Sequence, residues 1–83
     1  MSVETNEFAR LENHFYSLLF RVQQDESEEI KKIHKRAPYQ TEARDRALEE
    51  VKRSMANRRR NIRRAYYAGM EELRIKHEKE WAS

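Results

Sequence analysis

The chain has 83 residues, 40% of them charged and 37% hydrophobic, with a formal net charge of +3, and at this length it can hold at most one domain. The absence of cysteine excludes a disulfide framework and zinc sites built on thiolates, and a single glycine is too few for a phosphate-binding loop. No apolar run approaches the roughly 18 residues of a membrane span, so we expect no membrane partner.

The first predicted element is a helix over about residues 4–36. The N-terminal sequence resembles neither a secretory signal nor an Arg-rich transit peptide, so we expect a cytoplasmic protein, or a nuclear one in a eukaryote. A break near residues 25–28, where Asp25 and Glu28 have capping-box spacing, is an alternative to one continuous helix. Apolar residues recur every three or four positions, which indicates a heptad seam of Phe8, Leu11, Phe15, Leu18 and Val22. After a phase slip over residues 23–29 the seam resumes with Ile30, Ile33 and Ala37.

Residues 37–41 interrupt the helical pattern. Pro38 lacks a backbone donor and restricts the residue before it, so the first helix should end near Arg36. Thr41 is a suitable N-cap for a second helix over about residues 42–81. The apolar stripe of this helix, again at spacings of three and four, comprises Leu48, Val51, Met55, Ile62, Tyr66, Met70 or Gly69, Leu73, His77 and Trp81.

The predicted fold is all-α: one antiparallel two-helix hairpin with coiled-coil-like packing over residues 1–83. The same seam could also form between two chains that swap helices. Folding back at Pro38 predicts that Trp81 lies beyond the end of the first helix. The predicted register pairs Phe8 with Gly69 and Met70, Leu11 with Tyr66, Phe15 with Ile62, Val22 with Met55, and Asp25 and Glu26 with Lys52 and Arg53.

A second apolar edge on the first helix predicts self-association. Tyr16 and Phe20 are neighbours on the helix surface, and Leu19 joins them to the seam. Because small single cores seldom supply more than ~3–5 kcal/mol, we expect two hairpins to form a homodimeric four-helix bundle. Its predicted interface comprises Tyr16, Leu19, Phe20 and Trp81. Docking on a different helical protein is one alternative, and simple coverage of the hairpin's flank is another.

Charge is segregated along the chain. Residues 1–30 carry a net charge of −5 and residues 31–83 a net charge of +8, and no acid occurs between Glu50 and Glu71. Arginine, which dominates that interval, suits phosphate and carboxylate recognition. The candidate surface for an acidic protein or a nucleic acid comprises Lys52, Arg53, Arg60, Arg63, Arg64 and Tyr67. The alternative is ordinary solvated surface, or pairing with the acidic residues 25–29 of another subunit.

Arg58 or Arg59 must lie at the seam between Met55 and Ile62. We expect the aliphatic stem to follow the seam and the guanidinium to reach water. The alternative is a polar seam position that fixes the register or the oligomeric state.

The sequence offers no catalytic constellation. His14, His34 and His77 are far apart and lack a metal-binding spacing, and no serine stands at a strand-to-helix elbow. In the predicted register His77 projects beyond the first helix. We therefore expect no enzyme, no cofactor, no metal and no small-molecule substrate. The predicted function is a non-enzymatic interaction and assembly protein that presents an Arg/Tyr surface to a protein partner; the alternative is a small nucleic-acid-binding factor using residues 52–64.

Overall fold

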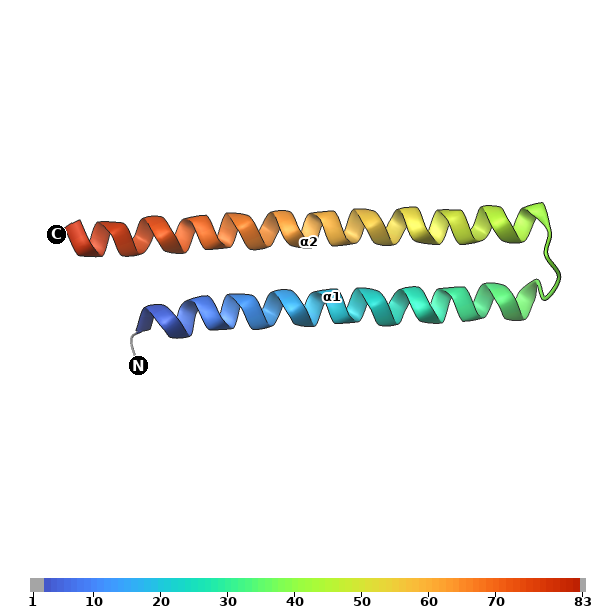
Figure 1. Cartoon of the computed structure of the whole chain (residues 1–83), viewed down its shortest axis with the longest axis horizontal. Helices are drawn as coiled ribbons and strands as arrows, with labels where there is room; N and C mark the ends of the chain where they lie inside the picture. The colour runs from blue at the N-terminus through green and yellow to red at the C-terminus, as the bar shows by residue number, and fades with distance from the viewer. Residues whose placement is uncertain (1–2, 83) are drawn as a thin grey trace.

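The protein is a hairpin of two long helices, seen in a computed structural model that describes residues 3–82 (Figure 1). Helix α1 spans Val3–Arg36 and helix α2 spans Glu42–Ala82. The helices run antiparallel and side by side, joined by residues 37–41, and α2 extends past the N-terminal end of α1. The predicted all-α hairpin is confirmed, and its helices begin and end within one residue of the expected positions.

The loop is held by capping contacts at both helix ends. The backbone N–H of Ala37 donates to the Ile33 carbonyl at 2.9 Å, which closes the last turn of α1 before Pro38. The hydroxyl of Thr41 accepts a hydrogen bond from the backbone N–H of Arg44 at 3.2 Å, as an N-cap does. The Arg44 side chain reaches back and donates to the Pro38 carbonyl at 3.3 Å. Proline, cap and arginine together fix the reversal of the chain.

Helix α1 is continuous through residues 25–28, so the break considered above does not occur. The phase slip there brings Asp25 and Glu26, rather than apolar residues, to the side that faces α2, where both bind arginines. The carboxylates are thus used between the helices and not as a cap within α1.

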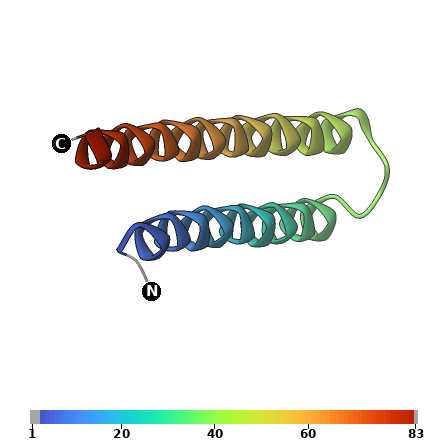
Figure 2. The same cartoon turned by 60° about the vertical axis from the view of Figure 1, so that its left-hand side comes forward.

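The hairpin is a single layer. The Cα atoms span 65 × 20 × 9 Å, and the radius of gyration is 19.0 Å. A compact domain of this length has a radius of gyration of about 12 Å. Both views show two helices with nothing stacked on either broad face (Figure 2). Among the described side chains only two hydrophobic ones are buried, Val22 at 0% exposure and Met55 at 7%.

The helices meet in a different register from the predicted one. Phe15 stacks on Tyr66 with ring centroids 4.3 Å apart, and Phe8 packs on His77 with centroids 5.5 Å apart. Leu11 lies against Gly69, where an added Cβ would come within 3.1 Å of a leucine methyl. These residues of α1 therefore meet residues three to eight positions further along α2 than expected. The predicted partners of Phe8, Leu11 and Phe15 were wrong by one or two helical turns.

The direction of side chains explains why the shift runs further along α2. Every Cα–Cβ bond in a helix tilts toward that helix's N-terminus. In an antiparallel pair the two sets of side chains therefore lean toward each other along the axis, so contacting residues do not have Cα atoms at the same level. Matching Cα levels from the loop, as the prediction did, places each partner too early in α2.

Candidate functional site

Two interhelical ion pairs flank the buried centre of the hairpin. Arg58 Nη1 donates to Asp25 Oδ2 at 3.0 Å and also lies 3.5 Å from the Met55 sulfur. Arg59 Nη2 and Nη1 donate to the two carboxylate oxygens of Glu26 at 2.9 and 3.5 Å. Consecutive helix residues are about 100° apart, so the two arginines pass on opposite sides of Met55. One interhelical ion pair therefore lies on each broad face of the hairpin, on either side of the seam.

These pairs correct two expectations. Asp25 and Glu26 do not lie opposite Lys52 and Arg53, and the seam guanidinium groups bind carboxylates of α1 instead of reaching only water. The hydrogen bonds that Arg59 donates to the Glu26 carboxylate raise the pKa of Arg59 above its ordinary value. Polar residues at seam positions that find specific partners favour one register over its neighbours. The register-fixing alternative is the one that the geometry supports.

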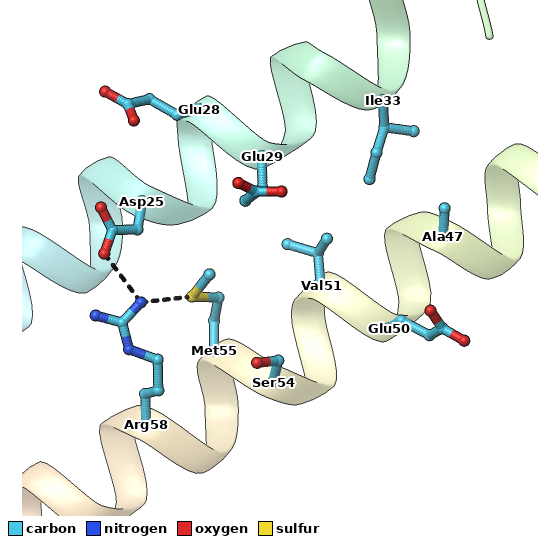
Figure 3. Close-up of a pocket in the computed structure, with 10 residues that line it drawn as sticks. All are labelled: Asp25, Glu28, Glu29, Ile33, Ala47, Glu50, Val51, Ser54, Met55 and Arg58. Carbon is cyan, nitrogen blue, oxygen red and sulfur yellow. Dashed lines mark hydrogen bonds and ion pairs between the residues drawn. The ribbon is translucent and has the colours of Figure 1, made fainter. Parts of the chain in front are cut away.

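One broad face carries an acidic groove around Arg58. Glu29 points into this groove and Glu28 away from it, while Ser54 lies on its α2 wall (Figure 3). No histidine is among the residues that line the groove. The lining residues are Asp25, Glu28, Glu29, Ile33, Ala47, Glu50, Val51, Ser54, Met55 and Arg58.

The opposite face carries what we call the aromatic groove. It is lined by Tyr16, Leu19, Phe20 and Gln23 of α1 and by Arg59 and Arg63 of α2. Tyr16 is 58% exposed and Phe20 is 60% exposed, whereas Leu19 is half-buried between them and the seam. Three residues of the predicted dimer interface are therefore neighbours. The fourth, Trp81, lies eighteen residues beyond Arg63, about 27 Å along α2.

The predicted basic surface divides between two positions on α2. Lys52 and Arg63 are turned toward the side that carries the aromatic groove. Arg53, Arg60 and Arg64, with Tyr67 beside them, follow the outer edge of α2, away from α1, and we call these four residues the basic edge. Arg60 donates to Asn57 Oδ1 at 3.2 Å. Within the described part of the chain, the three arginines of the basic edge have no carboxylate within 4.0 Å.

A polar cluster joins α1 and α2 at the end of the hairpin opposite the loop. Glu7 accepts hydrogen bonds from Lys76 Nζ at 2.9 Å and faces His77 Nε2 at 3.1 Å. The Lys76 hydrogen bond lowers the pKa of Glu7 and raises that of Lys76. The His77 side chain is 11% exposed, since Phe8 covers it and Glu80 lies 3.3 Å from Nδ1. The expectation that His77 projects beyond α1 was wrong, because the shifted register returns it to the seam.

The described residues offer no metal centre. Among the side chains that the structure describes, those of residues 6–81, no three His, Cys, Asp or Glu groups are close enough together to hold an ion. His14 and His34 are exposed and lie far from the His77 cluster along α1. The chemistry on this surface is thus hydrophobic contact and charge, carried by the aromatic groove and the basic edge.

Comparison with other proteins adds no assignment. Over the residues described, neither helix combines the length and the apolar character needed to cross a bilayer. The chain matches no family model, and no curated protein and no solved structure is significantly similar to it.

Proposed function

We propose that the protein is a non-enzymatic assembly protein whose hairpins pair through the aromatic groove into a four-helix-bundle dimer. The observation that carries the proposal is the exposure of Tyr16 and Phe20, which are 58% and 60% exposed beside Leu19. A contiguous apolar surface of this kind is typical of an interaction site.

The thin core supports the same conclusion. Val22 and Met55 are the only buried hydrophobic side chains that the structure describes, and a small single core seldom supplies more than ~3–5 kcal/mol. An aromatic side chain buries ~200 Å² in full, so each of the two half-exposed rings still has ~120 Å² to remove from water, worth ~3 kcal/mol. Pairing two grooves gives each hairpin the second layer that its own two helices lack.

Sedimentation equilibrium tests the pairing. The wild-type chain should have twice its monomer mass of 10.2 kDa, while Tyr16→Gln/Phe20→Gln should be monomeric. Glutamine is a good helix former, so α1 remains intact in the variant. The matched control is Tyr39→Gln, which removes an 80% exposed tyrosine from the loop and should leave the dimer unchanged. A folded groove variant with the wild-type mass, or a wild type that is monomeric throughout, would contradict the proposal.

The basic edge is the surface that we propose for a further partner. In the proposed dimer it stays on the outside, because Arg53, Arg60 and Arg64 lie on the side of α2 opposite to the seam. Arginines without carboxylate neighbours are free to bind an acidic protein, the partner class that we favour. The same observation supports a nucleic acid as the second candidate.

Fluorescence anisotropy of a labelled DNA duplex separates the two partner classes. A nucleic-acid function predicts binding at about 50 mM salt that is largely lost at about 200 mM. It also predicts loss of binding in Arg53→Gln/Arg60→Gln/Arg64→Gln and retention in Arg74→Gln, whose arginine pairs with Glu71 within α2. If the duplex does not bind at low salt, the nucleic-acid candidate is rejected.

A further inference from the structure

We propose that the two hairpins of the dimer lie with their loops at the same end, so that α1 of each packs on α2 of the other. This inference rests on the proposed dimer and adds its orientation and its contacts. Two hairpins stacked through the same face can be related by a twofold axis along the helices or by one across them. The first axis places unlike helices together, and the second places each helix on its own copy with the loops at opposite ends.

The charge at the level of the groove distinguishes these arrangements. The aromatic groove is lined by Arg59 and Arg63, so it lies within residues 58–69 of α2. That stretch contains five arginines and no acid. Two of these arginines, Arg59 and Arg63, line the groove, so a twofold axis across the helices would stack both on their own copies. Like charges brought together at an interface oppose association.

The facing stretch of α1 has the opposite sign. Leu11 contacts Gly69 and Asp25 binds Arg58, so residues 11–26 of α1 lie at the same level as residues 58–69 of α2. On the side of the aromatic groove, α1 carries Glu12, one turn before Tyr16, and Glu26, which binds Arg59 within the hairpin, whereas Asp25 lies in the acidic groove on the other face. A twofold axis along the helices preserves this level, so it stacks Arg63 on a side of α1 that carries acids and no base. Charge complementarity therefore selects the same-end dimer.

The contacts of Arg63 point the same way. Within one hairpin Arg63 lines the groove together with Tyr16 and Phe20. In the same-end dimer the guanidinium of each Arg63 faces the aromatic rings of the other hairpin, where a cation–π contact stabilises it. In the opposite-end dimer the two Arg63 groups instead approach each other near the axis.

Distance measurements between spin labels test the orientation, since a chain without cysteine accepts a label at one introduced site. Gln40→Cys marks the loop and Lys79→Cys the open end. In the same-end dimer both label pairs lie within about 30 Å, the order of two stacked helix layers plus the labels. In the opposite-end dimer both pairs are separated by nearly the 65 Å length of the hairpin. Long distances at both sites would overturn the inference.

A label at mid-length separates failure of the orientation from failure of the dimer. Ser17→Cys lies near the level of the groove, so its labels fall within about 40 Å of each other in either arrangement. A short Ser17→Cys distance with long Gln40→Cys distances rejects the orientation alone. The absence of any distance at all three sites rejects the dimer itself.

Arg63→Gln gives a second test, because the substitution should change the dimer affinity in opposite directions in the two arrangements. In the same-end dimer the substitution removes a favourable contact with the rings and should weaken dimerisation about threefold to tenfold. In the opposite-end dimer it removes a repulsion and should strengthen dimerisation. A tighter Arg63→Gln dimer, measured by sedimentation equilibrium, would refute the same-end arrangement.

Discussion

Val22 is the most completely buried side chain that the structure describes, and its truncation measures how much the seam contributes to stability. Val22→Ala removes two carbon atoms, worth ~1.6 kcal/mol of transfer free energy at ~0.8 kcal/mol each. The cavity that remains adds to this cost, while the better helix propensity of alanine offsets part of it, so we expect a net loss of about 1.5 kcal/mol. For a chain of this size that loss lowers the melting temperature by about 6–12 °C.

The assay is thermal and urea unfolding followed by far-UV circular dichroism. All variants are compared at equal chain concentration, because dimerisation makes apparent stability depend on concentration. Ile75→Ala is the matched control, since Ile75 is 41% exposed on the outer side of α2 and its truncation should cost less than about 0.5 kcal/mol. If Val22→Ala is no more destabilising than Ile75→Ala, then Val22 is not at the centre of the core and our account of the seam fails.

Two further predictions concern the charges between the helices. Glu26→Gln and Arg59→Gln should each lower the unfolding free energy by up to about 1 kcal/mol. The double variant should lose less stability than the sum of the two single losses, because either substitution alone already breaks the ion pair. Strict additivity in this double-mutant cycle would show that the two side chains are not coupled. The pKa of Glu7 is lowered by Lys76, so its contribution to stability is fully present above the ordinary value of 4.5 and is lost as pH falls through the lower folded value. Glu7→Gln should therefore flatten the dependence of the urea midpoint on pH in the acidic range, and a wild-type slope in that variant would contradict the assignment.

Local signals in the sequence were sufficient for the helices and the loop. Pro38 and Thr41 act through their own backbone geometry and their nearest neighbours, so the ends of the two helices can be predicted from the local sequence alone. The period of the apolar residues identified Val22 and Met55 as seam positions, and both are buried. The neighbourhood of Tyr16, Leu19 and Phe20 was predictable for the same reason, since it lies within two turns of one helix.

The pairing between the helices was harder to predict from the sequence, because it depends on positions along both helix axes at once. The lean of side chains toward each helix's N-terminus favours contacts further along α2, and in the structure Arg58 binds Asp25 and His77 packs on Phe8. The phase slip at residues 23–29 was the available signal for the ion pairs, since it turns carboxylates toward the partner helix.

The hairpin topology also orders the events of folding. The ion pair between Asp25 and Arg58 joins residues 33 positions apart, whereas Glu7 and Lys76 are 69 positions apart. Closing a longer loop costs more entropy, so contacts near Pro38 form first and each later turn extends an existing pair of helices. The helices should therefore pair progressively from the loop toward the open end, and the Glu7–His77 cluster should form after the contacts nearer the loop and fray before them.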